Sequence, residues 1–322
     1  MNVKKEKTML NYGILSTASI CSRFIAGIRE SKNGYVYGIA SRNLETAKQY
    51  AIKEKINHYY GSYEECIEDE NIDIIYIPTM NAIHYKWAKF ALERHKHVVV
   101  EKPFVLFKEQ AMELFELSRK NHCFLMEAQK SVFLPTTLKL KELIETKTIG
   151  DIKYIDLTAG FPGRFPDGHW MTDHALGGGA LYGSCTYTVE FLNFLFNEPV
   201  YQYDGSFIKG KGSADDVVNF KLLFDNIIVS STISMCCALK NEAVFYGTKG
   251  YIVIKNFWKS NGLDVYIDGN QTHYDFPYTS EFVYENNHIQ ECIEKGWIES
   301  PVMNKEKTIY TVEIVEELYK RM

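Results

Sequence analysis

The chain has 322 residues, of which 46% are hydrophobic and 24% charged, values typical of a globular protein large enough for two domains. Its formal net charge of −5 gives it no basic character, so nucleic acid is not expected as a partner. No apolar run reaches the roughly 18 residues that span a bilayer, and the polar segment Met1–Lys7 lacks the apolar stretch of a signal peptide. The cysteines are scattered and odd in number, so we expect a reduced, cytoplasmic protein without a membrane segment.

In the first third of the chain, short apolar runs alternate with patterns of helical period. The apolar runs predict strands at Tyr12–Leu15, Tyr35–Ala40, Ile72–Ile77, His97–Val100 and Phe124–Met126. Helices are expected at about Ile20–Glu30, Leu44–Lys53, Ser62–Asp69, Ile83–Arg94 and Phe107–Lys120. Strands that alternate with helices of this length form right-handed βαβ units. Residues 1–126 are therefore predicted to be a doubly wound α/β domain on a parallel sheet.

The pattern changes after Met126, where one predicted helix, Pro135–Glu145, is followed by longer strands. These strands are Asp151–Ala159, Val217–Phe224, Ile227–Cys236, Ala243–Tyr246, Tyr251–Ile254 and Asp264–Ile267. One helix interrupts them and two more close the chain, at Leu181–Phe196, Ser280–Lys295 and Asn304–Lys320. Residues 127–322 are thus predicted to form an α+β domain with a large, mostly antiparallel open sheet. We allow for the final helix packing back on the first domain.

The first strand runs into the small residues that a dinucleotide-binding turn requires. Small side chains let backbone N–H groups approach a pyrophosphate at the helix N-terminus. The usual G-x-G-x-x-G pattern is degraded here, and tight strand–helix turns use small residues anyway, so the motif alone leaves both interpretations open. The cofactor-binding candidates in this turn are Gly13, Ser16, Thr17, Ala18, Ser19 and Ile20.

The second strand ends in Ala40-Ser41-Arg42, without the Asp or Glu that usually binds the ribose 2′-hydroxyl of NAD. The guanidinium of Arg42 suits a 2′-phosphate, and Ser41 offers a hydroxyl beside it. NADP(H) is therefore the expected cofactor, with NAD as the alternative. The non-functional interpretation is a surface arginine ahead of a helix cap at Asn43.

Two later strand ends carry polar residues toward the edge where parallel sheets bind ligands. Thr79 and Asn81 offer a hydroxyl and an amide to a ribose or nicotinamide, whereas His84 is expected mainly to anchor the loop. Glu101 and Lys102 follow the next buried strand. Because lysine shifts its pKa readily when desolvated, Lys102 is the first candidate for proton transfer. Glu101 is expected to hold ribose hydroxyls or to orient the lysine.

The second domain offers a polar segment followed by three glycines and a helix. Gly177, Gly178 and Gly179 permit close backbone approach and an abrupt helix start, which places Tyr187 in the second turn. The preceding His169, Asp173 and His174 lack a further ligand cluster, so no metal site is predicted.

Glu101-Lys102-Pro103 and Leu176-Gly177-Gly178-Gly179-Ala180-Leu181 are the most specific of these motifs. With them the chain resembles, over nearly its full length, the Gfo/Idh/MocA family of NAD(P)-dependent oxidoreductases, in the branch of dihydrodiol and xylose dehydrogenases. The resemblance implies an N-terminal Rossmann domain and a C-terminal domain whose outer sheet face often makes a dimer. It also implies that Lys102 lies beside the nicotinamide with Tyr187. The pair would exchange a proton with the substrate oxygen while hydride moves at the neighbouring carbon.

Two departures from the family concern the substrate side. Relatives usually carry Asp where this chain has Gly183. Many relatives also have Trp or Tyr followed by Arg-Phe in the segment where this chain has Gln129-Lys130-Ser131-Val132-Phe133. The substrate side is therefore expected to have diverged more than the cofactor side. The candidate substrate contacts are Gln129, Lys130, Asp173 and His174.

The predicted function is an NADP(H)-dependent dehydrogenase that acts on a hydroxyl or carbonyl of a sugar, polyol or cyclic diol. Lys102 and Tyr187 are its predicted catalytic residues, and a homodimer or higher homo-oligomer is expected. The first alternative is a cofactor-binding sensor or interaction protein with little turnover, which Gly183 and the altered segment around Lys130 favour. A second alternative is a glycoside hydrolase that retains its cofactor.

Overall fold

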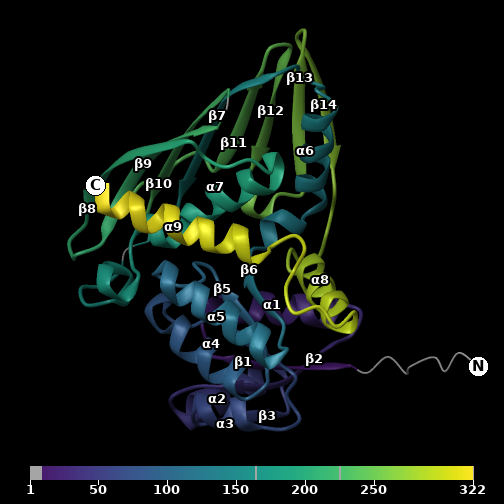
Figure 1. The fold of residues 1–322 in the computed structure, drawn as a ribbon, viewed down its shortest axis with the longest axis vertical. Coiled ribbons are helices and arrows are strands. Elements are labelled where there is room, and N and C mark those ends of the chain that lie inside the picture. The colour runs from purple at the N-terminus through teal and green to yellow at the C-terminus, as the bar shows by residue number, and fades with distance from the viewer. Residues whose placement is uncertain (1–8, 164, 225, 322) are drawn as a thin grey trace, which may run out of the picture.

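The protein is described by a computed structural model over residues 9–163, 165–224 and 226–321 (Figure 1). The N-terminal segment considered above for a signal peptide, Met1–Lys7, lies outside these residues. None of the helices within them is both long and apolar enough to cross a membrane.

The first domain is built on a parallel six-stranded sheet with the order β3-β2-β1-β4-β5-β6. Its strands are β1 (Leu10–Leu15), β2 (Gly34–Ala40), β3 (His58–Tyr60), β4 (Ile74–Ile77), β5 (His97–Glu101) and β6 (Leu125–Ala128). The helices that connect them are α1 (Ser19–Glu30), α2 (Leu44–Glu54), α3 (Tyr63–Glu68), α4 (His84–Glu93) and α5 (Lys108–Asn121). The order reverses between β1 and β4, and such a switch point is where doubly wound sheets bind ligands. The predicted doubly wound domain is confirmed.

The central strands are continuous apolar runs, because helices cover both faces of a parallel sheet. All four residues of β4 are buried, as are Val98, Val99 and Val100 of β5. The last strand, β6, extends to Ala128 and pairs with β5, so the parallel sheet continues past residue 126, where the first domain was expected to end.

The second domain contains an eight-stranded sheet with the order β14-β13-β12-β11-β7-β10-β9-β8. Its strands are β7 (Ile152–Gly160), β8 (Gln202–Lys209), β9 (Asp215–Phe224), β10 (Ile227–Ser234), β11 (Glu242–Gly247), β12 (Gly250–Lys255), β13 (Gly262–Ile267) and β14 (Asn270–Asp275). Every neighbouring pair is antiparallel except β7 with β10. The predicted mostly antiparallel sheet is confirmed.

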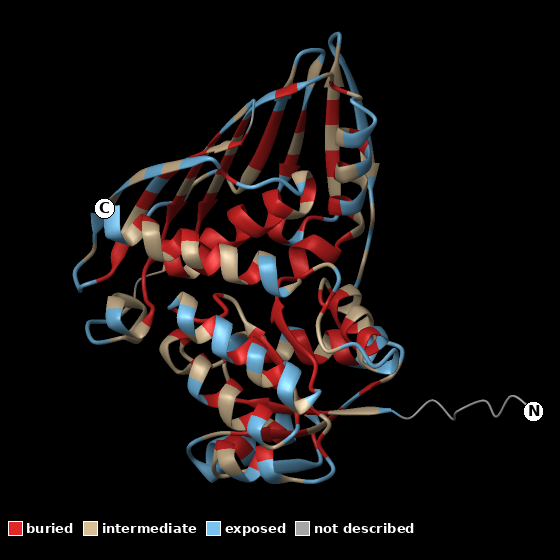
Figure 2. Cartoon of the chain, in the orientation of Figure 1, coloured by how far each residue is buried: buried red, intermediate tan, exposed pale blue. Residues whose placement is uncertain are grey.

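Helices cover one face of this large sheet and leave the other open (Figures 1 and 2). They are α6 (Pro135–Glu145), α7 (Ala180–Phe196) and α9 (Lys305–Arg321). Nearly every residue of α7 is buried, because this helix lies between the sheet and the first domain. Short 3-10 segments precede or follow the main elements at η1 (Asn81–Ile83), η2 (Lys130–Phe133), η3 (Trp170–Thr172), η4 (His174–Leu176) and η5 (Phe257–Lys259).

The C-terminal helices return to the first domain. The segment before α8 (Val283–Glu294) packs so closely on α1 that a Cβ added at Gly27 would lie 2.5 Å from the Cβ of Phe282. From α8 itself, the amide of Gln290 donates to the hydroxyl of Ser31 at 2.6 Å. Helix α9 is joined to the start of α5 by an ion pair between Lys108 and Glu313 at 2.6 Å.

Three strands were not predicted, and each of them is an edge strand. β3 and β14 are mostly exposed, and β8 alternates between exposed and half-buried residues. An edge strand buries few side chains, so its sequence does not need the apolar pattern that identifies a strand.

Candidate active site

The turn after β1 leaves the N-terminus of α1 free to receive an anion. Ser16 has φ of 115°, and its N–H and hydroxyl bind the carbonyls of Ala40 and Pro78 at 3.0 and 2.9 Å, so neighbouring strand ends fix the turn. No side chain caps α1 and no acidic residue lies in its first turn. The uncapped N–H groups and the positive end of the helix dipole suit a phosphate. Thr17, Ser19 and Ile20 lie at this end of the helix.

Gly13 lies inside β1 rather than in the turn. A Cβ at this position would lie 2.9 Å from both the Sγ of Cys66 and the Cδ1 of Ile72. The packing of α3 and the loop before β4 therefore explains this glycine without a cofactor.

Arg42 and Ser41 lie just after β2. Arg42 is exposed and makes no hydrogen bond or ion pair with the residues that the structure describes. The N–H of Ser41 donates to the carbonyl of Tyr60 at 3.2 Å, which fixes the backbone beside the arginine. An exposed guanidinium at the carboxyl end of β2 that has no ion pair fits the phosphate of a 2′-phosphorylated ribose.

The residues after β4 connect the two domains. The side-chain amide of Asn81 donates to the carbonyl of Gly177 at 2.7 Å, within the three-glycine segment. His84 is fully buried, with its two ring nitrogens 2.9 Å from the carbonyl of Pro103 and 3.1 Å from that of Thr79. Both nitrogens of His84 are thus occupied by the main chain, as its expected anchoring role requires, and neither is directed at a ligand. The Thr79 hydroxyl makes only a long contact, 3.4 Å, with the carbonyl of Met80.

Lys102 and Tyr187 come together across the domain junction. The ammonium of Lys102 lies 4.6 Å from the centroid of the Tyr187 ring and donates a hydrogen bond to the carbonyl of Gly183, one turn earlier in α7. Glu101 accepts a hydrogen bond from the hydroxyl of Tyr76 at 2.5 Å and one from the N–H of Lys102 at 3.2 Å. Burial raises the pKa of the Tyr187 phenol, while the charge of Lys102 acts to lower it.

A second lysine reaches the same tyrosine. Lys130, buried in η2, donates a hydrogen bond to the hydroxyl of Tyr187 at 2.9 Å. Its ammonium lies 4.9 Å from the Tyr187 ring centroid and 5.0 Å from that of Phe282. Burial lowers the pKa of Lys130 to about 8, and the carboxylate of Glu101 acts against this shift.

Two buried carboxyl groups, those of Glu127 and Glu190, lie near these residues. Gln129, which is fully buried, donates its amide to Glu190 of α7 at 2.6 Å. Burial raises the pKa of Glu190, and it raises that of Glu127 well above the ordinary range, with the charge of Glu190 adding to the effect. Two adjacent buried carboxyls do not both ionise, so this pair retains a proton. The side-chain amide of Gln129 therefore binds a buried carboxyl group within the protein and is not directed at a substrate.

Asp173 and His174 are engaged in their own segment. Asp173 accepts hydrogen bonds from the N–H of Ala175 and the hydroxyl of Ser213, both at 3.0 Å. The ring of His174 packs edge-on to Tyr319, with 4.5 Å between centroids. No hydrogen bond, ion pair or ring contact joins either residue to Lys102 or Tyr187. The structure therefore brings Lys130, but not these two, to the lysine–tyrosine pair.

Sequence reasoning missed the apolar neighbours of the pair. The ring of Trp258, in η5, lies 6.0 Å from that of Tyr187, and Phe161 lies 5.0 Å from Trp258. A Cβ at Gly183 would be 3.8 Å from the Cε of Met171 and 3.9 Å from the Sδ of Met235. These residues come from four separate loops and elements, so no local motif could have identified them. Within the described ranges, no group of three or more His, Cys, Asp or Glu side chains could hold a metal ion.

Family models match both domains. A model of the oxidoreductase family with an NAD-binding Rossmann fold matches residues 10–129, and one of the GFO/IDH/MocA C-terminal domain matches residues 137–253. Fold and match together define an oxidoreductase with a nicotinamide dinucleotide cofactor. The chain belongs to the Gfo/Idh/MocA family, which confirms the predicted family and its class of activity.

Curated relatives are similar over nearly their whole length. Trans-1,2-dihydrobenzene-1,2-diol dehydrogenase of Xenopus laevis is 33% identical over 328 residues, which cover 97% of each chain. The enzyme of the same name from Mus musculus is 31% identical and covers 97% of this chain and 96% of its own.

Solved structures share the fold. KijD10, a 3-ketoreductase from Actinomadura kijaniata in complex with NADP and TDP-benzene, matches with a TM-score of 0.88 at 20% identity, covering 98% of each chain. Aldose-aldose oxidoreductase from Caulobacter crescentus matches with a TM-score of 0.87 at 21% identity, covering 97% of each. At these identities the likeness shows the two-domain fold alone.

Proposed function

We propose that the protein is an NADP(H)-dependent dehydrogenase that interconverts a hydroxyl and a carbonyl on a sugar, polyol or cyclic diol. The observation that carries this proposal is the pairing of Lys102 with Tyr187 at the carboxyl edge of the Rossmann sheet, 4.6 Å from ammonium to ring centroid. A proton-transfer pair at this edge lies where a substrate carbon can approach a nicotinamide.

The residues present fit a 2′-phosphorylated dinucleotide. The uncapped N-terminus of α1 would receive the pyrophosphate, and the unpaired guanidinium of Arg42 would receive the 2′-phosphate. Glu101, which already orders Tyr76 and the Lys102 backbone, is positioned for ribose hydroxyls. When bound, the nicotinamide supplies or accepts the hydride.

Side chains of the protein transfer the proton to and from the substrate oxygen. In the reducing direction, Tyr187 gives its hydroxyl proton to the substrate oxygen, and in the oxidising direction it takes that proton back. The charge of Lys102 favours the phenolate that this exchange produces, against the effect of burial. Contact with a main-chain carbonyl holds the Lys102 ammonium in place, so little reorganisation is needed during the reaction.

The substrate class follows from the surroundings and from the relatives. The relatives named above act on a trans-dihydrodiol, by their name, and the unsaturated ring of such a diol suits the aromatic side chains of Trp258 and Phe161 near Tyr187. Two thioethers, of Met171 and Met235, border the space at Gly183, so this side of the site is apolar as well.

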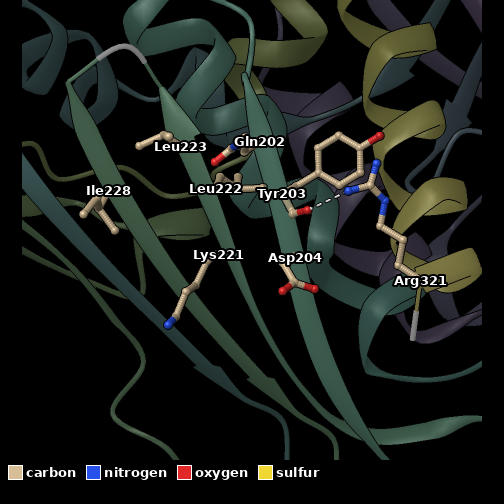
Figure 3. A pocket seen from close by; sticks show the side chains of 8 residues that line it. All are labelled: Gln202, Tyr203, Asp204, Lys221, Leu222, Leu223, Ile228 and Arg321. Carbon is tan, nitrogen blue, oxygen red and sulfur yellow. Dashed lines mark hydrogen bonds between the residues drawn. The ribbon is translucent and has the colours of Figure 1, made fainter.

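We also propose that the protein forms a homodimer through the open face of the large sheet. One row of paired residues crosses this face from β9 to β13, namely Leu223, Ile228, Tyr154, Tyr246, Tyr251 and Tyr266. Ile228 is 53% exposed and Tyr246 is 42% exposed. Beyond this row the face becomes polar, with Asp204 and Lys221 extending from β8 and β9 in a surface depression (Figure 3). An aromatic and apolar row that crosses all strands of this face except the two edge strands can meet its own copy about a two-fold axis.

A dimer through this face is sensitive to charge at its centre. We expect Tyr246→Glu to convert the dimer into a monomer in size-exclusion chromatography with light scattering, with NADPH binding retained. An unchanged mass would exclude this interface.

We further propose a cytoplasmic location, since all seven cysteines are free.

The function is tested by following absorbance of the reduced cofactor with both NADP and NAD. The substrate panel contains aldoses, polyols and trans-1,2-dihydrobenzene-1,2-diol, and the Lys102→Ala variant is the control. Turnover with NADP that the variant loses supports the proposal. Tight NADPH binding with no turnover on the whole panel would instead identify a cofactor-binding sensor.

A further inference from the structure

The site contains a second buried amine whose role the lysine–tyrosine pair does not explain. Lys130 is only 5% exposed, yet no carboxylate among the described residues lies within ion-pair distance of its ammonium. Among the described residues, the one polar partner of its ammonium is the Tyr187 hydroxyl at 2.9 Å, and the rings of Tyr187 and Phe282 lie close to it as well. A buried charge normally requires a counter-charge or several hydrogen bonds.

The direction of this hydrogen bond defines what Lys130 does to the tyrosine. An ammonium has only donors, so the Tyr187 oxygen accepts from Lys130 and its own O–H remains available. The Lys102 ammonium lies over the ring and is bonded to Gly183 instead. The two lysines therefore act on different parts of one phenol, Lys130 at the oxygen and Lys102 at the ring.

We infer that Lys130 is a positioning residue for Tyr187: it directs the phenol proton toward the substrate and balances the phenolate that forms when this proton leaves. The inference rests on the function proposed above. In the reducing direction, the O–H bond of Tyr187 breaks and a new O–H bond forms on the substrate oxygen as the carbonyl carbon gains the hydride. The ammonium of Lys130 can then pass a proton along its existing hydrogen bond to the phenolate, and solvent returns a proton to the amine.

Charged groups from three elements face this lysine and tyrosine. They are Glu101 and Lys102 at the end of β5, Arg23 on α1 and Glu285 on α8. Burial lowers the pKa of Lys130 to about 8, close enough to neutral pH for the amine to hold or release a proton during turnover. Burial also raises the pKa of Glu285 to about 8, so the two groups have to be separated by experiment.

The first measurement does not depend on turnover. A 3-fluorotyrosine placed at position 187 reports, by its 19F resonance, any change of charge on the neighbouring amine. We expect titration near pH 8 in the otherwise unchanged protein, to which both Lys130 and Glu285 can contribute. The step should persist in Glu285→Gln, which removes the other group that titrates near this pH. In that background it should be absent in Lys130→Met and in Lys130→Arg, because a guanidinium stays protonated throughout this range. A step near pH 8 that survives in the Lys130→Met, Glu285→Gln double variant overturns the inference, even if the protein is a dehydrogenase.

The second measurement uses the substrate that the panel identifies or, failing any, trans-1,2-dihydrobenzene-1,2-diol with NADP. Loss of a charge-assisted hydrogen bond predicts a fall in kcat of about 10- to 100-fold for Lys130→Met, with partial rescue in Lys130→Arg. In a Tyr187→Phe background the same substitution should cost almost nothing more, because Lys130 acts through the phenol. Equal effects in both backgrounds would show a merely structural lysine.

Lys96 supplies the matched control. It is a buried lysine that directly precedes β5, so it lies at the amino end of the strand that Lys102 follows. Its ammonium donates to the carbonyls of Asp69 and Ile72, both at 2.7 Å. Lys96→Met should lower the melting temperature but leave the 19F titration and the pH profile of kcat unchanged. If Lys96→Met altered them as Lys130→Met does, general destabilisation would explain both results and the inference would fail. Absent turnover with an intact 19F step would contradict the proposed function alone.

Discussion

Lys102, at the end of β5, donates a hydrogen bond to the main-chain carbonyl of Gly183 in α7. The bond crosses from the nucleotide-binding domain to the second domain. Because the acceptor belongs to the backbone, a substitution at position 183 that keeps the helix leaves this acceptor in place. The orientation of Lys102 therefore does not depend on a side chain at position 183.

Replacing Lys102 by Ala should lower kcat by at least about 100-fold, the lower range for positioned acid–base assistance. NADPH binding, measured by fluorescence titration, should stay within a few-fold of the original, since the N-terminus of α1, which we propose binds the pyrophosphate, is untouched. The matched control is Lys120→Ala, which removes an exposed lysine on α5. Equal turnover in the two variants would remove Lys102 from the mechanism.

Arg42→Ala should weaken NADPH binding by about 10- to 100-fold, the effect of losing a charge-assisted hydrogen bond to a phosphate. The Kd for NADH should change less than two- to three-fold, because NADH has no 2′-phosphate for the guanidinium. Isothermal titration calorimetry with both cofactors measures the ratio. Arg29→Ala, on the last turn of α1, should change neither value. A parallel loss of NADH affinity would mean that Arg42 supports the fold instead.

Two helix glycines should respond to alanine with opposite sign. At Gly183 a methyl group meets only the flexible ends of Met171 and Met235, at 3.8 and 3.9 Å. Gly183→Ala should therefore raise the free energy of unfolding by about 0.5–1 kcal/mol through better helix propensity. At Gly27 the same methyl lies 2.5 Å from the Cβ of Phe282, so Gly27→Ala should lower it by about 1–3 kcal/mol. Guanidinium denaturation of both variants tests the contrast.

Glu285 should make the folded state less stable as pH rises. Both of its carboxyl oxygens are buried without a hydrogen-bond partner among the described residues, and burial raises the pKa to about 8 from an ordinary 4.5. Between these values the folded chain holds a proton that the unfolded chain has lost, so this group's contribution falls by up to about 1.4 kcal/mol per pH unit.

Glu285→Gln should remove that slope between pH 5 and 8, measured as the free energy of unfolding at each pH. Glu291→Gln on the same helix is the control. The ion pair with Lys295 lowers the pKa of Glu291, so its stabilising contribution is already complete above pH 4.5. An identical pH dependence in Glu285→Gln and the original chain would contradict the buried, protonated carboxyl.

The sequence was sufficient for nearly all buried elements of both domains, because burial imposes an apolar pattern that can be recognised. The exceptions, β3, β8 and β14, are held by main-chain pairing to one neighbour and bury few side chains. The same division holds at the site. Lys102 follows a buried strand within a recognisable motif, whereas Trp258, Met171 and Met235 reach Tyr187 or Gly183 only through the tertiary fold.

The contact of Lys130 with Tyr187 is the clearest example of a site feature that no sequence motif predicts. Its position after β6 could be predicted, but the partner that defines it, Tyr187, is 57 residues further along the chain. Which of several polar residues near a sheet edge meets another depends on how two domains dock, and no local pattern encodes that docking. Asp173 and His174 were equally plausible from sequence and are engaged elsewhere.

The docking of α8 on α1 means that the nucleotide-binding half is not a separable module. Tyr12 and Phe24, at the centre of its core, are sealed by Phe282 and α8, which the chain supplies only after completing the large sheet. During synthesis, the surface of the first domain that α8 covers would stay exposed until most of the protein had left the ribosome. A chimera that exchanges the first domain for that of a relative would therefore have to carry the relative's α8 as well.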